Sequence, residues 1–217
     1  FLSRARAKGY GVPDQAFRQA LDNLRNQVNY QADFDRGGEG LAYALMVLAR
    51  EGAAAIGDLR YYADVKGDAF ATPAAMAQLG AALASYGDQP RADAMFARAG
   101  IAMQALGDTA PEQILRADYG SNFRDAAAVL ALATEAGSKA IDAEALTNRI
   151  TANGALSPQE SVWALLAANA LIDRKGADGL LINGQPSAGP LAISATSEPV
   201  LRSEEHTSEL QSPMFIS

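Results

Sequence analysis

The sequence predicts an all-α fold of helical hairpins, followed by a short β segment. Three observations predict it. Apolar residues recur at spacings of three and four within segments of about 10–15 residues, and short turns containing Gly, Pro or Asp separate these segments. Aromatic residues make up only 7% of the chain and alanine is abundant, which favours closely packed helices. After Gly179 the helical pattern gives way to short β-type runs.

The first helices are recognised by their turns and apolar faces. Residues 1–8 are basic, as the last turns of a helix often are, and Gly9 can cap them. A second helix opens at Pro13–Asp14 and carries an apolar face made of Phe17, Leu21, Leu24 and Val28. Residues 41–50 are almost wholly apolar, so we expect this third helix to be buried on most sides.

The middle helices are predicted mainly from capping signals. We expect Asp58 to cap a helix whose inner face holds Leu59, Tyr62 and Val65. Thr72–Pro73 starts the next helix, because threonine is a good cap and proline fits the first helical position. Residues 88–99 predict another helix with Ala92, Met95, Phe96 and Ala99 inward. Residues 100–116 are less regular and are expected to form a longer connection.

Three further helices complete the helical part, and each begins at a capping residue. The caps are Ser121, Asp142 and Ser157. The last is the strongest signal, because Pro158 follows the serine directly and Glu160 stands three residues after it, which makes a capping box. Gly137 ends the first of these helices, and the third ends near Gly176. Trp163 lies in an Ala/Leu stripe of the third helix and is expected in the core.

These patterns divide the chain into three parts. Residues 1–177 form the helical domain, and residues 178–201 form a β segment with strands expected at 180–182 and 191–193. Residues 202–217 resemble the translation of a sequencing-library adapter and are expected to be an artefactual tail. The chain begins with Phe and is expected to start in mid-helix. Helical hairpins alone leave two architectures open, a solenoid and a closed ring.

Composition excludes several kinds of chemistry. The chain carries a net charge of −7, which argues against a nucleic-acid or anionic-membrane surface. It contains no cysteine, so a disulfide, a thiolate metal site or a thioester made within the chain is excluded. The single histidine, His206, lies in the suspected tail. The remaining body therefore lacks the residues for a Ser-His-Asp or Cys-His mechanism and for the common zinc sites. No stretch of the sequence is long and apolar enough for a membrane span.

Two glycine-containing patterns are weak candidates for ligand sites. Asp33, Asp35, Gly38 and Glu39 faintly resemble a calcium loop, but Gly37 and Ala44 stand where an EF-hand needs ligands. A turn with acidic residues near a helix start is the better interpretation. The pair Gly37–Gly38 is not a phosphate loop, because no Gly-Lys-Ser/Thr follows it.

The remaining candidates are charged or aromatic residues with ordinary structural explanations. The mixed charges Asp58, Arg60, Asp64, Lys66 and Asp68 favour a solvated helix face. On the same helix, one of Tyr61 and Tyr62 is expected in the core and the other at a groove. Asp118 and Asp125 flank Tyr119-Gly120-Ser121. The favoured interpretation is that these two aspartates cap helices. The alternative is that they act as the acid and the base that cleave a sugar substrate. No catalytic, cofactor-binding or metal-binding residue is assigned, and no cofactor is expected.

One tetratricopeptide-like unit is present at residues 79–99. Leu79-Gly80, Leu83, Gly87, Ala92, Phe96 and Ala99 fit it, with small residues that let two helices approach. An array needs the pattern again about 34 residues later, where Gln113–Ile114 stands instead of Leu-Gly. A tetratricopeptide-like scaffold for protein–protein interaction therefore stays an alternative. An α/α-toroid glycoside hydrolase is a second alternative, suggested by the surplus of acidic residues.

A series of segments in order resembles the bacterial alpha-2-macroglobulin family, in the later part of its thioester-bearing helical domain. The segments are AFRQALDNLRNQV (16–28), FDRGGEGLAYALMVLAR (34–50), IGDLRYYADVKGDAFATPAAMAQLGAAL (56–83), DYGSNFRDAAAVLALA (118–133) and LSPQESVWALLAANAL (156–171). The resemblance implies an α/α toroid, with residues 178–201 starting a CUB-like β-sandwich. The likeness covers about residues 16–200, and its specificity comes from the series, because no single motif is a chemical signature.

The resemblance also implies a function. The resemblance implies a protease trap. In such a trap a nucleophile on the protease attacks a thioester between a Cys and a Gln, and the protease becomes covalently tethered. This implies a broad-spectrum endopeptidase inhibitor that is not an enzyme. Its partners would be target proteases, its location periplasmic, and its anchor a lipoprotein N-terminus outside this chain. The thioester and the bait segment also lie outside it, so the chain would form the wall of the site. No nucleic-acid binding and no membrane insertion by this segment are expected.

Overall fold

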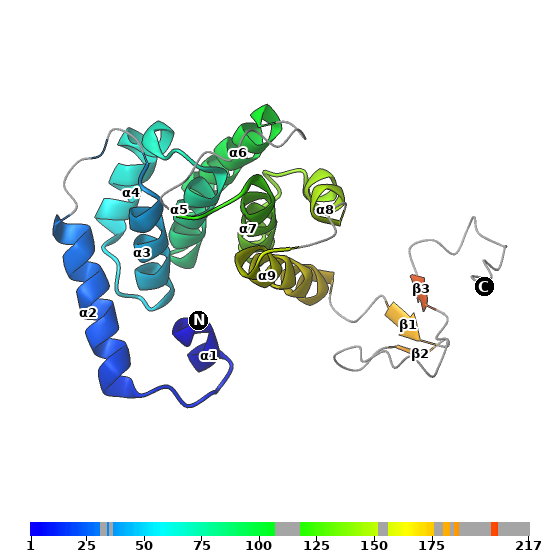
Figure 1. Ribbon diagram of the computed structural model, residues 1–217, viewed down its shortest axis with the longest axis horizontal. Coiled ribbons are helices and arrows are strands. Elements are labelled where there is room, and N and C mark those ends of the chain that lie inside the picture. The colour runs from blue at the N-terminus through cyan, green and yellow to red at the C-terminus, as the bar shows by residue number, and fades with distance from the viewer. Residues whose placement is uncertain are drawn as a thin grey trace. The chain divides into compact units, whose positions relative to one another are not determined.

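The computed structural model describes residues 1–30, 34, 37–106, 118–151, 156–175, 180–182, 185–186 and 201–203. The chain divides into two compact units, Phe1–Ala170 and Leu171–Ser217. The described part of the first unit is built from helices (Figure 1). Their bounds are α1 Leu2–Ala7, α2 Asp14–Tyr30, α3 Glu39–Arg50, α4 Ile56–Val65, the short 3-10 helix η1 Gly67–Ala69, α5 Pro73–Ser85, α6 Gln89–Ala105, α7 Asn122–Glu135, α8 Ala143–Thr151 and α9 Pro158–Lys175.

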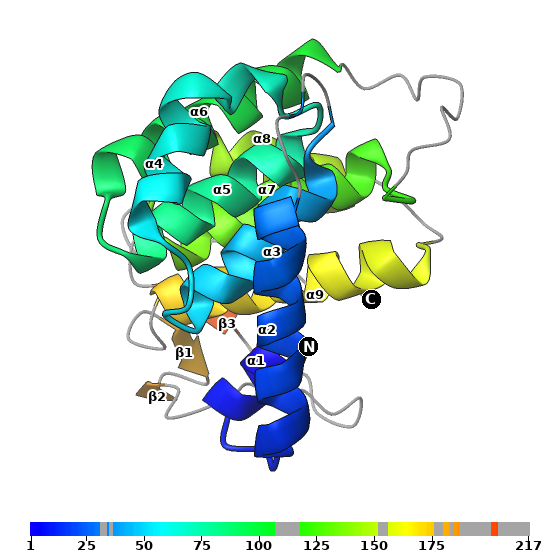
Figure 2. The same ribbon diagram turned by 90° about the vertical axis from the view of Figure 1, so that its left-hand side faces the viewer.

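Helix α5 lies at the centre of the first unit, between α3 and α7, while α6 and α4 pack on it from outside (Figure 2). Helix α8 packs against α7, and α2 packs against α3. Helices two places apart in the chain, such as α3 and α5 or α5 and α7, therefore lie side by side, as expected when each helical hairpin packs against the next. All twelve residues from Phe123 to Thr134 of α7 are buried, so this helix has no solvent-facing side within that stretch.

Helices α5 and α6 pack closely at Gly80. A Cβ atom placed on Gly80 would lie 3.2 Å from the carbonyl oxygen of Ala92 and 3.2 Å from the ring of Phe96. Phe96 is fully buried, so its ring fills the space that the missing side chain of Gly80 leaves. The small residue and the phenylalanine therefore have the packing role predicted for the residue 79–99 unit. The repeat expected near Gln113–Ile114 falls outside the described residues.

Ion pairs connect three helices at their C-terminal ends. Both guanidinium nitrogens of Arg4 donate to the carboxylate of Glu135, at 2.7 and 2.9 Å, and Arg50 donates to the same carboxylate at 3.3 Å. Ser3 also donates a hydrogen bond to Glu51. These contacts hold α1 against the ends of α3 and α7. A bidentate arginine adds geometric specificity, which favours one position for this short first helix.

Most predicted helices are confirmed, and two boundaries differ. Helix α4 begins at Ile56 after Ala55, so Asp58 lies in its first turn and does not cap it. An acidic residue is favourable in either place, because both lie near the positive end of the helix dipole. Helix α6 continues to Ala105, through Gly100, where a connection was expected. Met103 explains the difference, because it extends the buried face of the helix by one more turn.

The described part of the second unit contains three short strands. They are β1 Leu180–Ile182, β2 Gln185–Pro186 and β3 Leu201–Ser203. Both β2 and β3 pair with β1 in antiparallel orientation, which gives the strand order β2-β1-β3. Strand β1 is thus where the sequence predicts one, and β3 includes Arg202 and Ser203 of the suspected tail. The expected strand at 191–193, the expected boundary near residue 177 and residues 204–217 lie outside the described residues.

The start of α5 gives a first testable prediction. The hydroxyl of Thr72 accepts a hydrogen bond from the backbone N–H of Ala75 at 3.2 Å, and Thr72 is buried. Replacing it by alanine (Thr72→Ala) leaves that N–H unsatisfied and should lower the free energy of unfolding by about 1 kcal/mol. Thr72→Ser keeps the acceptor and is the matched control. Urea denaturation measures both variants, and equal losses in the two would contradict the capping role.

Candidate functional site

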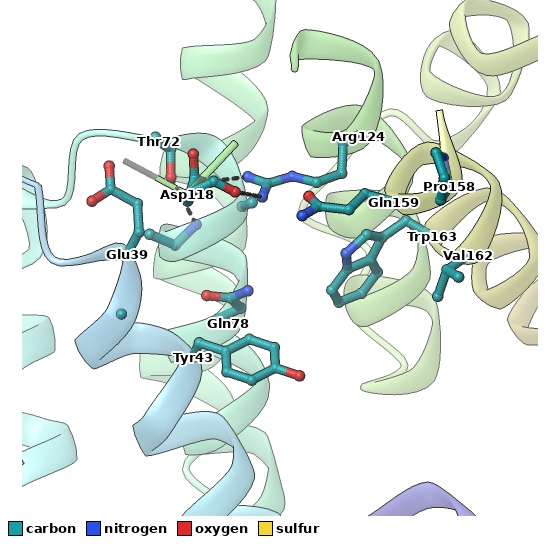
Figure 3. Close-up of a pocket in the computed structure, with 13 residues that line it drawn as sticks. Glu39, Tyr43, Thr72, Gln78, Asp118, Arg124, Pro158, Gln159, Val162 and Trp163 are labelled. Carbon is teal, nitrogen blue, oxygen red and sulfur yellow. Dashed lines mark hydrogen bonds and ion pairs between the residues drawn. The ribbon is translucent and has the colours of Figure 1, made fainter. Parts of the chain in front are cut away.

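The first unit has a groove at the N-terminal ends of four helices. Its volume is about 560 Å³, and α3, α5, α7 and α9 each contribute residues from their first turns or from the residues before them (Figure 3). The lining residues are Glu39, Gly40, Tyr43, Thr72, Ala74, Ala75, Gln78, Asp118, Arg124, Pro158, Gln159, Val162 and Trp163. All of them belong to the described part of Phe1–Ala170. Helix N-termini carry partial positive charge, so this position attracts acidic groups.

An ion-pair cluster closes one end of the groove. Nη2 of Arg124 lies 2.6 Å from Oδ2 of Asp118 and 2.7 Å from Oδ1 of Asp125. Nε of Arg124 also donates to Oδ1 of Asp125 at 3.2 Å, and Nη1 donates to the carbonyl oxygen of Asp118 at 3.4 Å. Asp125 is fully buried and the Arg124 side chain is 10% exposed. The cluster therefore keeps its charges inside the protein by pairing them.

The turn before α7 is shaped to hold this arginine. Oδ1 of Asp118 accepts a hydrogen bond from the N–H of Gly120 at 3.1 Å. Ser121 then caps α7 by accepting from the N–H of Arg124 at 3.1 Å, as the sequence predicts. A Cβ atom on Gly120 would collide with the guanidinium group of Arg124. A larger residue at this position would therefore require the guanidinium group of Arg124 to shift.

Asp118 and Asp125 are thus brought together, but by a cation that they share. An acid and base that cleave a glycosidic bond must face the substrate on its two sides. Both of these carboxylates instead bind Arg124, and Asp125 has no exposed surface. This geometry supports the structural interpretation of the two acids. Sequence reasoning did not include Arg124, although its place between the two acids in the chain was a signal for it.

Several polar groups that line the groove have no hydrogen-bond or ion-pair partner among the residues that the structure describes. Gln78 is only 8% exposed, yet its amide makes no hydrogen bond to any described residue. Glu39, Tyr43 and Gln159 also line the groove, and within the described chain their side chains make no hydrogen bond or ion pair. In Figure 3, Gln78 and Tyr43 lie on one wall, and Gln159 and Trp163 lie on the facing wall. These groups are available to a ligand.

Trp163 corrects a sequence-based expectation. It was expected in the core, but it is half-buried and lines the groove. Ala167 and Ala170 form the buried face of α9 instead, and Val162 and Leu165 are 56% and 71% exposed. The Ala/Leu stripe therefore contains the buried face of α9, and the error concerns Trp163, which lies at the groove and not in the core. Neither Gln78 nor Tyr43 was singled out from the sequence.

Helix α9 is fixed at the groove by its capping box. The N–H of Ser157 donates to Oε2 of Glu160 at 2.7 Å, and the N–H of Glu160 donates to the hydroxyl of Ser157 at 3.3 Å. Glu160 also accepts a hydrogen bond from the hydroxyl of Ser121 at 2.5 Å, which links α9 to the cap of α7. The box predicted from the sequence is confirmed, and it has this additional role between two helices.

Most other residues singled out from the sequence form surface contacts away from the groove. Asp33 and Asp35 lie outside the described residues. A Cβ atom on Gly38 would come within 2.9 Å of the rings of Phe34 and Phe70, and Gly38 has a φ of +74°, so packing explains this glycine. The paired charges of this region are Arg60 with Asp88, Arg91 with Asp64 and Asp88, and Arg98 with Asp68.

The neighbouring tyrosines of α4 differ in exposure, but they do not occupy the core and groove positions expected for them. Tyr62 is half-buried near Phe34 and Phe70, and its ring centre lies 6.5 Å from that of Phe70. Tyr61 is 45% exposed. It is absent from the residues that line the groove at the ends of α3, α5, α7 and α9.

Two negative findings concern only the described residues. Their Asp, Glu and His side chains form no cluster of three that could hold a metal ion. Within the same residues, no helix combines the length and the apolar composition that a membrane crossing requires.

Comparison with known proteins shows which proteins contain a segment similar to this chain. No family model matches the chain. Over 189 residues the sequence is 31% identical to the alpha-2-macroglobulin of Escherichia coli strain K12, with 81% of the chain covered. The chain matches bacterial alpha-2-macroglobulin. It spans only 11% of the length of this curated relative, so the alpha-2-macroglobulin match concerns one small segment of a much longer protein.

Solved alpha-2-macroglobulin structures agree with the sequence match. A crystal structure of the native E. coli protein from domain MG7 to the C-terminus superposes with a TM-score of 0.67 at 26% identity, over 93% of this chain and 31% of that one. The E. coli protein activated by porcine elastase gives a TM-score of 0.64 at 29% identity, over 79% of this chain and 16% of that one. The helical unit thus has an alpha-2-macroglobulin counterpart in three dimensions.

The capping box of this alpha-2-macroglobulin-like segment gives a second prediction, which depends on pH. Burial alone raises the pKa of Glu160, but the hydrogen bonds from Ser121 and Ser157 outweigh it and hold the pKa below its usual range. Because the folded state lowers the pKa, Glu160 stabilises the fold above its unfolded value of about 4.3. That contribution is lost as the pH falls through the lower folded value.

We therefore expect Glu160→Gln to reduce the free energy of unfolding by about 0.5–2 kcal/mol at neutral pH. The difference from the wild-type chain should shrink as the pH falls below about 4. Urea denaturation at a series of pH values measures it. Glu144→Gln is the matched control, because Glu144 is an exposed acid in the first turn of α8. A difference that stays constant down to pH 3 would contradict the role given to the ionised carboxylate.

Proposed function

We propose that this chain is part of a bacterial alpha-2-macroglobulin-like inhibitor of endopeptidases. In this proposal its helices are the later part of an α/α toroid, they form the wall around a thioester site, and residues 178–201 begin a CUB-like β-sandwich. The observation that carries the proposal is the match with E. coli alpha-2-macroglobulin in both sequence and structure. Alpha-2-macroglobulin is a protease inhibitor and not a protease, so the match supports inhibition rather than catalysis.

The chemistry of the proposed site requires a group from outside this chain. A thioester joins a cysteine sulfur to an acyl carbon, and this chain has no cysteine. When an amine attacks the acyl carbon, the C–S bond breaks, an amide forms and the thiol is released. Water competes with the amine for the same carbon, so the thioester must be kept dry until it is needed. Closely packed helices such as α5 and α7 are suited to exclude water.

The place of the groove agrees with this proposal. The first turns of α3, α5, α7 and α9 meet there, so the backbone N–H groups at four helix ends lie near one another. Such ends stabilise negative charge, including the charge that develops on a carbonyl oxygen during attack by an amine. We further propose target proteases as partners and the periplasm as the location, with attachment to the inner membrane through a lipoprotein N-terminus in another part of the protein.

The decisive experiment uses the full protein encoded by the gene that contains this chain. The purified protein is incubated with elastase, and denaturing gel electrophoresis measures the fraction of protease in covalent complexes. We expect such complexes, and we expect prior treatment with methylamine to abolish them, because the small amine consumes the thioester. Elastase inactivated at its active site is the control and should not be trapped. A protein that traps no protease and incorporates no methylamine would refute the thioester-site proposal.

A further inference from the structure

We propose that the groove between α3, α5, α7 and α9 binds a neutral saccharide without cleaving it. The proposal goes beyond the inhibition of endopeptidases and does not depend on a thioester. Three features of the groove support it. They are a buried amide that no described residue completes, charges that disfavour both anions and cations, and two facing walls that each combine an aromatic ring with an amide.

The buried amide of Gln78 is the first feature. Gln78 is only 8% exposed, and its amide points into the groove (Figure 3). A buried amide normally forms hydrogen bonds, because burying it without a partner costs free energy. Gln78 forms none with the residues that the structure describes, and its neighbours Ala77 and Leu79 are fully buried in the apolar core. An apolar residue would serve packing at least as well, so the amide points to a ligand that bonds to it.

Charge is the second feature, and it favours a ligand that carries none. Arg124 is the positively charged residue of the described lining, and both Asp118 and Asp125 bind it. Glu39 adds a further carboxylate, so the side chains disfavour an anion. A cation is disfavoured as well, because the N-terminal ends of α3, α5, α7 and α9 carry partial positive charge. A neutral polar ligand meets neither penalty.

The walls of the groove are the third feature. Tyr43 and Gln78 lie on one wall, and Trp163 and Gln159 lie on the facing wall (Figure 3). Gln159 and Trp163 are one helical turn apart on α9, so they share a face of that helix. Both rings are accessible, since Tyr43 is 45% exposed and Trp163 is half-buried. Each wall therefore offers a ligand both an apolar ring and an amide that donates and accepts hydrogen bonds.

A saccharide matches this pattern on both of its faces. Its ring is puckered, so C–H groups that pack on an aromatic ring lie next to hydroxyls that donate and accept hydrogen bonds. A nucleobase carries its polar groups only at its edge and could not bond to amides on both walls. An extended peptide is disfavoured, because the ion-pair cluster around Arg124 closes one end of the groove. The volume of about 560 Å³ is in the range of small-molecule sites.

The groove is suited to bind a saccharide and not to hydrolyse it. Hydrolysis of a glycosidic bond needs an acid and a base on the two sides of that bond. Asp118 and Asp125 are both held by Arg124, and Asp125 is fully buried. These two acids are therefore not placed to act on a ligand that lies between the walls.

Trp163 provides the readout, because it is the single tryptophan of the chain. The 217-residue chain is titrated at pH 6 with the neutral disaccharides cellobiose, maltose and N,N′-diacetylchitobiose, each in a separate experiment, while the tryptophan emission is recorded. We expect a saturable change with at least one of them. Chitobiose, which carries ammonium groups, and cellobiuronic acid, which carries a carboxylate, should bind at least about fivefold more weakly than the best neutral disaccharide.

The same titration distinguishes the other classes of ligand. The short peptide acetyl-Ala-Ala-Ala-amide and the nucleoside adenosine should give no saturable change. A chain that responds to none of the neutral disaccharides, or that binds a charged disaccharide, the peptide or adenosine equally well, would overturn the proposal.

Two tyrosines with the same exposure locate the binding. Tyr43→Ala should weaken the best disaccharide by about fivefold, because it removes one of the two aromatic walls. Tyr61→Ala is the matched control and should leave the affinity unchanged. Tyr61 is also 45% exposed, but it does not line the groove. Equal affinities in these two variants would show that the saccharide does not bind in the groove.

Gln78→Leu separates a ligand-binding role from a structural one. Removing a buried amide without a described partner should raise the melting temperature of the free chain, and it should weaken the disaccharide by about tenfold. An unchanged affinity in the folded variant would refute the role given to this amide and with it the proposal. If Gln78→Leu does not fold, the comparison of Tyr43→Ala with Tyr61→Ala decides alone.

The outcomes for the saccharide and for the protease are separable. If the chain binds a neutral disaccharide but the full protein traps no protease, the groove is a saccharide site and the thioester proposal fails. If the full protein traps protease but the chain binds none of the disaccharides, the saccharide proposal fails and the proposed function stands.

Discussion

Replacing Arg124 with methionine (Arg124→Met) should lower the free energy of unfolding by about 3–5 kcal/mol. The substitution leaves Asp125 fully buried and Asp118 mostly buried without the cation that both of them bind. The loss of a buried arginine that binds two carboxylates is far more costly than the loss of a surface contact. Urea denaturation at neutral pH measures the loss, and far-UV circular dichroism checks that the variant is folded at zero urea.

A second arginine provides the control for this prediction. Arg50 pairs with Glu135 at 3.3 Å, and both side chains are 27% exposed. Arg50→Met should therefore cost about 1 kcal/mol or less, because solvent screens this pair. Removing Asp125 together with Arg124 (Arg124→Met with Asp125→Leu) should recover part of the loss, since the double variant no longer buries that carboxylate. Equal losses for Arg124→Met and Arg50→Met would contradict the importance given to the buried cluster.

Truncating Phe96 to alanine (Phe96→Ala) should cost about 3–5 kcal/mol. The ring is fully buried between α6 and α5, and its removal leaves a cavity beside Gly80 that the rigid helices cannot fill. Ile101→Ala, on the same helix, is the matched control. Ile101 is 67% exposed, so its truncation should change the stability by less than about 1 kcal/mol. Urea denaturation compares the two variants.

A double-mutant cycle tests the contact between Phe96 and Gly80 directly. In the wild-type chain, the Cβ atom of Gly80→Ala would lie within 3.2 Å of the Phe96 ring, which is closer than ordinary packing allows. In the Phe96→Ala background the crowding by the ring is relieved, and the close contact with the carbonyl oxygen of Ala92 at 3.2 Å is kept. The same alanine should then be less destabilising than in the wild-type background, because its higher helix propensity, worth about 1 kcal/mol, is opposed by one close contact fewer. An effect of Gly80→Ala that is identical in the two backgrounds would show that the two sites are not coupled.

Sequence reasoning was most successful where the signal is local. Thr72, Ser121 and Ser157 were predicted as caps, and the structure confirms the hydrogen bond that each accepts. Asp58 was predicted as a cap for the same reason and is not one, because α4 starts earlier. The predicted end of α6 was also wrong. Gly100 is a residue at which helices often end, but α6 continues to Ala105 because Met103 extends its buried face. A capping signal depends on a few neighbouring residues, whereas a helix end also depends on its tertiary contacts.

The candidate site could not be predicted in the same way. The groove brings together the first turns of α3, α5, α7 and α9, which are separated by long stretches of sequence. Each of its residues has an ordinary explanation when it is seen alone. Gln78 resembles a polar interruption of an apolar helix, and Trp163 resembles a core residue. The resemblance to alpha-2-macroglobulin indicated the family but assigned no residue of this chain to a site. Only the arrangement in space shows that these residues share one cavity.

The complete burial of α7 between Phe123 and Thr134 also affects how the sequence of this region can change. An ordinary helix at a protein surface tolerates variation on one side, so the pattern of permitted residues repeats every three to four positions. Helix α7 has no such side. A scan that places a glutamate at each of these twelve positions should give a uniform loss of folded protein without that periodicity. The backbone amides of the same stretch should exchange with deuterium only when the whole unit unfolds.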